Sequence, residues 1–198
     1  MQSNVATLAM AAVGAALIAG SGEALAPDAA PAGCTAMEDD PAAAPLAFAA
    51  EHQALVGYLS RRFTIATEAT EQIVEAAHRA ADEVGLDPLL VLAVIAVESR
   101  FNPIAQSSMG AKGLMQIIPK YHRAKLDRHG GEQAVLDPES NIFVGARILQ
   151  EYVHRTGSLE AGLQFYNGAF WDGSAQYAQR VMAERRRLEA ALRAERNA

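Results

Sequence analysis

The chain has 198 residues, 51% of them hydrophobic and 6% aromatic, and runs of strand-favouring residues are scarce. These values predict a mainly α fold with a single domain, because a chain of this length buries one sizeable core once its ends are discounted. The formal net charge of −6 argues against nucleic acid as a partner, since phosphate binding needs patches of Lys and Arg, and a single cysteine, Cys34, excludes an internal disulfide.

The N-terminal residues predict export from the cytoplasm. Residues 5–20 are all apolar or small, and residues 24–26 read Ala-Leu-Ala, a pattern suited to a signal peptidase. We therefore expect residues 1–26 to be a signal peptide and the protein to be periplasmic or in the cell envelope. Since no Lys or Arg precedes the apolar run, an uncleaved membrane anchor and a buried core helix stay as alternatives. Cys34 follows small residues, as a lipoprotein cysteine does, so a lipid tether is a further alternative.

Residues 27–47 are predicted to be a disordered linker. They are mainly Ala, Pro, Gly and acidic residues without periodicity, a composition that buries too little apolar surface to offset the entropy of ordering the chain. The folded domain is then expected to span residues 48–182. Beyond Met182 the helical pattern is highly charged, which predicts a charged helical tail over residues 183–198.

Two helices are predicted early in the domain. Residues 67–84 carry apolar side chains at the three-and-four spacing of an amphipathic helix, which the following glycine stops. Asp87 and Pro88 then provide an N-cap and a first-turn proline for a helix whose residues 89–97 are apolar on every side. Such a helix lies at the centre of a core, and residues 102–103 (Asn-Pro) are expected to close it.

Three more helices are predicted in the second half of the chain. Asp137 and Pro138 again provide a cap and a first-turn proline, and residues 142–153 present small residues where another helix can approach closely. A shorter helix over residues 159–164 leads into a Tyr-Asn-Gly turn, and residues 177–197 are helical in pattern.

Glu98 is the strongest catalytic candidate in the sequence. It lies in the last turn of the apolar helix, where a carboxylate has little water on the core side, and desolvation raises the pKa of a carboxyl group. The negative end of the helix dipole acts in the same direction. A raised pKa suits a general acid at neutral pH. The alternative is a solvated Glu where the helix meets the surface.

A glycine-containing loop follows this helix. Gly110 and Gly113 interrupt any helix or strand period, which indicates a shaped loop whose main chain a ligand can approach. Gln116 is a lone amide among apolar neighbours, and the hydroxyl and acetamido groups of sugars are suitable partners for it. The histidines do not fall at zinc-ligand spacings, so neither a metal nor another cofactor is expected.

A group of residues between Glu98 and Tyr177 forms a motif. Its first part is Glu98-Ser99, Phe101-Asn102-Pro103, Ser107, Gly110-Ala111, residues 113–117 (Gly-Leu-Met-Gln-Ile) and Pro119, and its later part is Asn141, Gly145, Ala146, Leu149, Tyr166-Asn167 and Tyr177. In order and spacing the motif resembles the signature of the soluble lytic transglycosylase family, over roughly residues 84–181. The resemblance implies a lysozyme-like domain of the goose type, with a small irregular or β element near the active-site loop.

The resemblance also implies roles for individual residues. Glu98 takes the place of the family's catalytic acid and base, and Tyr177 falls where a tyrosine approaches the catalytic carboxylate. The residues that fall where the family lines the cleft around the reacting sugars are Ser107, Met115, Gln116, Tyr166 and Asn167. Phe165 and residues 170–172 (Phe-Trp-Asp) are bulkier than the family pattern, so the distant sugar subsites are expected to differ.

The implied activity is that of a lytic transglycosylase on the glycan strands of peptidoglycan. Glu98 is the one good carboxylate candidate, whereas ordinary glycoside hydrolysis uses two. In the family reaction one Glu protonates the β-1,4 bond between N-acetylmuramic acid and N-acetylglucosamine, and the muramic acetamido group assists. Attack by the sugar's own 6-hydroxyl then gives a 1,6-anhydromuramyl end.

Two other functions stay open on the sequence. A hydrolytic muramidase would use a loop carboxylate such as Asp172 to position water, and a non-catalytic module would bind peptidoglycan without cleaving it. For the transglycosylase, the sequence is compatible both with general remodelling of the wall and with local opening for a secretion apparatus or other cell-wall machinery.

Overall fold

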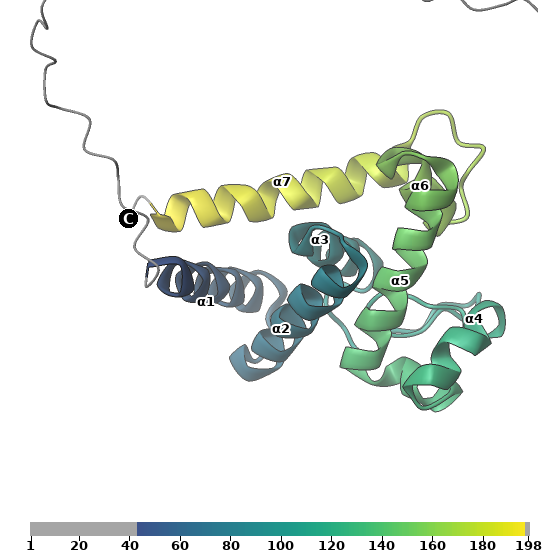
Figure 1. Cartoon of the computed structure of the whole chain (residues 1–198), viewed down its shortest axis with the longest axis horizontal. Helices are drawn as coiled ribbons and strands as arrows, with labels where there is room; N and C mark the ends of the chain where they lie inside the picture. The colour runs from purple at the N-terminus through teal and green to yellow at the C-terminus, as the bar shows by residue number, and fades with distance from the viewer. Residues whose placement is uncertain (1–42, 197–198) are drawn as a thin grey trace, which may run out of the picture. The chain divides into compact units, whose positions relative to one another are not determined.

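The computed structural model describes residues 43–196, which are mainly helical (Figure 1), and this confirms the predicted mainly α class. The α-helices are α1 (Ala43–Phe63), α2 (Thr67–Val84), α3 (Pro88–Glu98), α4 (Pro119–Leu126), α5 (Pro138–Thr156), α6 (Leu159–Tyr166) and α7 (Gln176–Arg196), with short 3₁₀ helices η1 (Asp127–His129) and η2 (Glu132–Leu136). Among these helices none has both the length and the apolar character needed to cross a bilayer. The predicted signal peptide, Cys34 and most of the predicted linker lie outside the described residues.

Helix α3 is the centre of the core, as its all-apolar sequence predicts. Pro88 is its first residue, and the Asp87 side chain caps it by accepting a hydrogen bond from the backbone N–H of Leu89 at 2.9 Å. The side chains of residues 91–95 are fully shielded from water. Helix α3 packs against α2 and α7 (Figure 1), so neighbouring elements surround its apolar surface.

The end of α3 differs from the prediction. The helix ends at Glu98, before residues 102–103, because Arg100 and Phe101 adopt left-handed backbone conformations with φ of 54° and 63°. Such conformations are costly for residues with a β-carbon. The buried ring of Phe101 packs on the ring of Phe63 at a centroid distance of 4.8 Å, and this contact helps to hold the sharp turn. The turn leaves Glu98 as the last helical residue.

Other local signals in the sequence are confirmed. Gly85 ends α2 in a left-handed conformation with φ of 71°. Asp137 caps α5 by accepting a hydrogen bond from the backbone N–H of Ser140 at 2.8 Å. Helix α5 packs against both α2 and α6, and this places α6 beside the central core.

The segment between α3 and α4 is an irregular loop with a small β element. Its backbone pairs antiparallel at two isolated bridges, Gln106 with Lys112 and Lys112 with Ile117. This agrees with the predicted irregular or β element near the active-site loop. The loop starts directly after Glu98, so its shape determines what surrounds that side chain.

The limits of the folded part differ from those predicted. Helix α1 starts at Ala43, ahead of the expected domain start at residue 48, and α7 continues without a break through the predicted tail of residues 183–198 as far as Arg196. Leu188 and Leu192 of α7 are buried in the main core, and α7 packs along α1. Two leucines four residues apart form a packing stripe on an otherwise charged helix. The tail is therefore part of the domain.

Gly145 provides a test of the helix packing. A β-carbon at this position of α5 would lie 2.5 Å from the sulfur of Met115, so we expect Gly145→Ala to lower the free energy of unfolding by about 1–3 kcal/mol through overpacking. Gly57→Ala on α1 is the matched control, because its β-carbon would meet only the movable end of Arg61, at 3.2 Å. Thermal unfolding followed by circular dichroism compares them, and equal melting temperatures would contradict the packing argument.

Candidate active site

Glu98 is held largely away from water at the end of α3. Its Oε1 accepts a hydrogen bond from the hydroxyl of Tyr177 at 2.6 Å, and Tyr177 itself is only 2% exposed. Tyr177 belongs to the first turn of α7, so the packing of α7 on α3 brings together residues that are far apart in the sequence. The structure places Tyr177 beside the carboxyl group, where the family resemblance implies a tyrosine.

Burial raises the pKa of the Glu98 carboxyl group above its ordinary value. The hydrogen bond from Tyr177 and the positive charge of Arg180 lower the pKa, because both stabilise the carboxylate, but desolvation is the larger effect. Glu98 therefore keeps its proton to a higher pH than an exposed Glu does. This is the property that a general acid needs near neutral pH.

Tyr166 joins the end of α6 to the loop after α3. Its hydroxyl donates a hydrogen bond to the backbone carbonyl of Met115 at 2.8 Å. Burial, and then the negative charge of Glu98, raise the pKa of Tyr166 well above its usual value. The hydroxyl therefore stays protonated and remains a donor, and the Tyr166 side chain lies within electrostatic reach of Glu98.

The buried side chain of Asn141 on α5 fixes the loop after α3. Its Oδ1 accepts a hydrogen bond from the backbone N–H of Met115 at 2.7 Å, and its Nδ2 donates to the backbone carbonyls of Val135 at 2.7 Å and Lys112 at 3.0 Å. Gly113 passes so close that a β-carbon there would lie 2.3 Å from Nδ2. One amide therefore joins the loop, η2 and α5.

Gln116 and Ser107 are both oriented by the loop backbone. Gln116 has a left-handed φ of 49°, and its Nε2 donates to the carbonyls of Gly113 at 2.9 Å and Ala105 at 3.2 Å. Ser107 lies in an exposed turn, where its Oγ accepts a hydrogen bond from the N–H of Ala111 at 3.1 Å. The amide of Gln116 is therefore fixed before any ligand binds.

A cavity of about 240 Å³ contains three of the predicted cleft residues, Gln116, Tyr166 and Asn167. The rest of its lining is Ile117, Ile118, Tyr121, His122, Ile148, Tyr152, Phe165 and Gly168. Apolar and aromatic walls with a few oriented polar groups are typical of a site for a small ligand or one sugar unit of a polymer. Glu98 is not among the lining residues, but Tyr166, which lines the cavity, lies within electrostatic reach of Glu98.

Two predicted cleft residues do not line this cavity, Ser107 in its exposed turn and Met115 in the core. The Met115 side chain is fully buried and packs against Gly145, where a β-carbon would come within 2.5 Å of its sulfur. Its contribution is made by the backbone, since the N–H binds Asn141 and the carbonyl accepts from Tyr166. The backbone of Met115 therefore helps to hold the loop in place.

Three further residues contribute to the site, beyond those predicted. Asn141 belongs to the motif, but its position in the sequence does not show that its side chain binds the backbone of the loop after α3. The positive charge of Arg180 lowers the pKa of Glu98. Arg180 follows Tyr177 by three residues, a spacing that places both on one face of a helix. Gln164 is buried, and its Oε1 accepts from the N–H of Ala178 at 3.0 Å, which fixes the start of α7.

Asp172 is a turn residue in the loop between α6 and α7. Its Oδ1 accepts hydrogen bonds from the backbone N–H of Ser174 at 2.9 Å and from the Ser174 hydroxyl at 2.5 Å. These bonds lower the pKa of Asp172. The carboxylate thus stabilises the turn that leads into α7.

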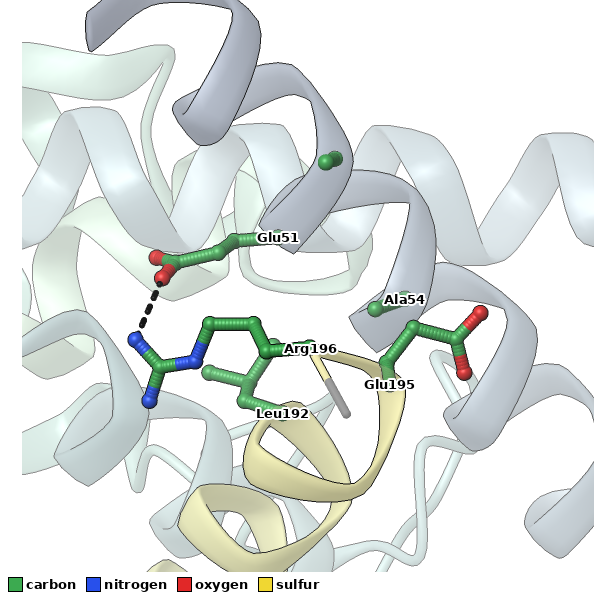
Figure 2. Close-up of a pocket in the computed structure, with 6 residues that line it drawn as sticks. Glu51, Ala54, Leu192, Glu195 and Arg196 are labelled. Carbon is green, nitrogen blue, oxygen red and sulfur yellow. Dashed lines mark hydrogen bonds and ion pairs between the residues drawn. The ribbon is translucent and has the colours of Figure 1, made fainter. Parts of the chain in front are cut away.

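A second apolar cavity lies far from Glu98, between the start of α1 and the end of α7 (Figure 2). It has a volume of about 130 Å³, and the ion pair between Glu51 and Arg196 lies at its edge, with the two side chains 3.3 Å apart. Leu192 in its wall follows Tyr177 by 15 residues, which is about 22 Å along a helix. This cavity is therefore separate from the candidate active site.

Comparison with known proteins agrees with this arrangement. Residues 75–186 match the family described as the transglycosylase SLT domain. The chain is 37% identical over 89 residues to the transglycosylase of Enterobacteria phage PRD1, a match that covers 45% of this chain and 32% of that protein. It is 42% identical over 71 residues to the endo-type membrane-bound lytic murein transglycosylase A of Klebsiella pneumoniae, covering 33% of this chain and 35% of the other.

The fold is also shared with a solved structure. An inactive mutant of the lytic transglycosylase Slt from Pseudomonas aeruginosa superposes with a TM-score of 0.53 at 22% identity, over 61% of this chain and 24% of that one. This likeness shows the lysozyme-like fold. The chain spans about a third of the length of the two relatives named above. Because the family match covers more than half of the sequence, the chain belongs to the transglycosylase SLT domain family.

Proposed function

We propose that this protein is a lytic transglycosylase that cleaves the glycan strands of peptidoglycan. The observation that supports this most is the single shielded carboxyl group of Glu98, which receives a hydrogen bond from Tyr177 and lies within electrostatic reach of Tyr166, a residue that lines a cavity suited to a sugar unit. Relatives are named lytic murein transglycosylases, and the chain corresponds to a part of them.

In the proposed reaction Glu98 starts protonated and donates its proton to the glycosidic oxygen between N-acetylmuramic acid and N-acetylglucosamine. The bond to the muramic anomeric carbon breaks, and the muramic acetamido group stabilises that carbon. Glu98 is now a carboxylate, and it removes the proton of the 6-hydroxyl as this oxygen attacks the anomeric carbon. The product is a 1,6-anhydromuramyl end, and Glu98 regains its proton without consuming water.

Hydrolysis is the less well supported alternative. It normally uses a second carboxylate as nucleophile or base. Within residues 43–196, the partner described for the Glu98 carboxyl group is the Tyr177 hydroxyl, and the nearby charge is that of Arg180; neither is a carboxylate that could act as a base on water. Asp172, the loop carboxylate considered for that role, is already bound by Ser174 in the turn before α7. These contacts favour attack by the sugar's own hydroxyl.

We further propose that the protein works in the cell envelope. Its substrate lies there, and several relatives are named membrane-bound murein transglycosylases. Residues 1–26 would serve as an export signal or anchor, and residues 27–42, which precede α1, as a linker that gives the domain reach. A partner in a secretion apparatus or in cell-wall machinery is compatible with this arrangement.

Turnover on purified sacculi tests the proposed function. We expect the full chain, at far less than stoichiometric concentration, to release soluble glycan fragments continuously, measured by chromatography of the supernatant. A non-catalytic module would bind the sacculi in a sedimentation assay and release nothing. Binding without release would therefore reject the enzymatic proposal.

A further inference from the structure

The loop between α6 and α7 exposes two large aromatic side chains. Phe170 is 50% exposed and Trp171 is 78% exposed, and the loop projects from the ends of these helices (Figure 1). Neither exposure is explained by packing of the core. Exposed aromatic groups that adjoin a cavity are typical of binding surfaces, where flat rings contact a ligand.

Phe170 contacts Phe165 in the wall of the candidate active-site cavity, and Trp171 contacts Phe170, with their ring centroids 3.3 Å apart. The ring of Phe165 lies 4.7 Å from the ring of Tyr152 on one side and stacks on Phe170 at 5.3 Å on the other. Phe165 lines the cavity of Gln116 and Tyr166, and it also lines a neighbouring cavity of about 290 Å³. We name Phe165, Phe170 and Trp171 the aromatic ridge.

We propose that the aromatic ridge is a stacking platform for sugar rings, which extends the glycan-binding groove beyond the cavity of Gln116 and Tyr166. This inference rests on the proposed function and concerns the length of glycan that the protein grips. Phe170 and Trp171 would contact a sugar that is not cleaved. They are therefore specificity residues that favour long strands over short fragments.

The chemistry beside the ridge suits a glycan. The neighbouring cavity combines two rings of the aromatic ridge with Ser158 and Glu160, where the Ser158 hydroxyl is free to donate and the carboxylate can accept from sugar hydroxyls and acetamido groups. Glu160 and Asp172 place carboxylates at the same cavity, and the chain carries a net charge of −6. The guanidinium of Arg155 lies over the Phe165 ring at 5.2 Å, but the two carboxylates exceed its charge and repel the anionic headgroups of a bacterial membrane, which is the other flat surface that an exposed Trp could meet.

Kinetics on substrates of two lengths tests the platform. We expect Trp171→Ala to lower kcat/KM on long, peptide-free glycan strands by about tenfold, because it removes one large stacking surface. On a fragment short enough to fill only the cavity near Glu98, the variant should equal the parent. Trp171→Phe should keep most of the activity on long strands, since it retains an aromatic face.

Gln72→Ala is the control. Gln72 is exposed on α2, away from the loop after α3, and lines neither of the two cavities, so its removal should not affect either substrate. An equal loss on long and short substrates with Trp171→Ala would overturn the platform, because a distant subsite cannot affect a fragment that does not reach it. A loss of the same size with Gln72→Ala would overturn it as well.

Fluorescence provides a readout that does not depend on turnover. Trp171 is the only tryptophan in the chain, so its emission reports on this position alone. In the full chain carrying Glu98→Gln, we expect long glycan strands to shift the emission to shorter wavelength, as stacking shields the indole from water. Vesicles of anionic phospholipid should leave it unchanged.

The outcomes separate the inference from the proposed function. If the parent releases no glycan from sacculi but the emission shifts with glycan strands, the proposed activity fails and the platform stands. If the parent is active but the emission does not respond to glycan, the platform is wrong and the activity stands. A response to vesicles and none to glycan would assign the ridge to a membrane surface and overturn the inference.

Discussion

Glu98→Gln is expected to reduce the release of glycan fragments by about 10²–10⁴-fold, the usual contribution of a general acid or base. The substitution keeps the size of the side chain and an oxygen that can accept the hydrogen bond from Tyr177, but removes the transferable proton. Rates of sacculus solubilisation by parent and variant measure the effect. Glu71→Gln, at an exposed position on α2, is the control and should be fully active.

The same substitution is expected to preserve or increase stability at neutral pH. Because burial raises the pKa of Glu98 in the folded state, the folded protein binds this proton more tightly than the unfolded chain does. The stability that Glu98 contributes is present below its unfolded pKa and is lost as the pH rises through the folded pKa. As the pH rises from the unfolded pKa to the folded pKa of Glu98, the parent should therefore lose stability relative to Glu98→Gln. Retention of activity, or unfolding of the variant at neutral pH, would contradict this account.

Asn141→Ala is expected to lower the free energy of unfolding by about 2 kcal/mol or more, because it leaves two buried backbone groups without their partner, the N–H of Met115 and the carbonyl of Val135. The carbonyl of Lys112 also loses the amide but keeps its hydrogen bond from the backbone N–H of Ile117 at 3.0 Å. The loop that orients Gln116 should loosen, so kcat/KM should fall together with stability. Thermal unfolding and sacculus assays measure the two effects.

Ser140→Ala is the neighbouring control for Asn141→Ala. Ser140 uses its backbone N–H in the cap of α5, and alanine keeps that bond. We expect its melting temperature and activity to match the parent. If Asn141→Ala lowered the melting temperature no more than this control does, the loop would not depend on the Asn141 amide.

Features that depend on neighbouring residues could be predicted from the sequence. Asp87 and Asp137 cap the helices that follow them, and Gly85 ends α2, because each of these devices acts within one helical turn. The position of Glu98 at the end of an all-apolar helix also predicts its burial, since the rest of that helix must be in the core. The family motif added Gln116, Tyr166 and Asn167, which the structure brings to one cavity.

Features that depend on distant contacts could not be predicted. Asn141 binds Met115 across 26 positions, and no local pattern indicates which backbone groups an amide will meet. The left-handed turn at Arg100 and Phe101 contains no glycine, so the sequence contains no local signal for it. The contact of Phe101 with the distant Phe63 helps to stabilise the turn. The many charges after residue 182 suggested a separate tail, although the two buried leucines of α7 join that segment to the core.

Product analysis of purified peptidoglycan tests the central claim most directly. The claim is that Glu98 alone donates and then removes the proton while a sugar hydroxyl replaces water. Mass spectrometry of the released fragments should show 1,6-anhydromuramyl ends, one water lighter than hydrolysis products, and none of them with Glu98→Gln. Hydrated reducing ends from the parent would contradict the account, as would anhydro products formed at the parental rate by the variant.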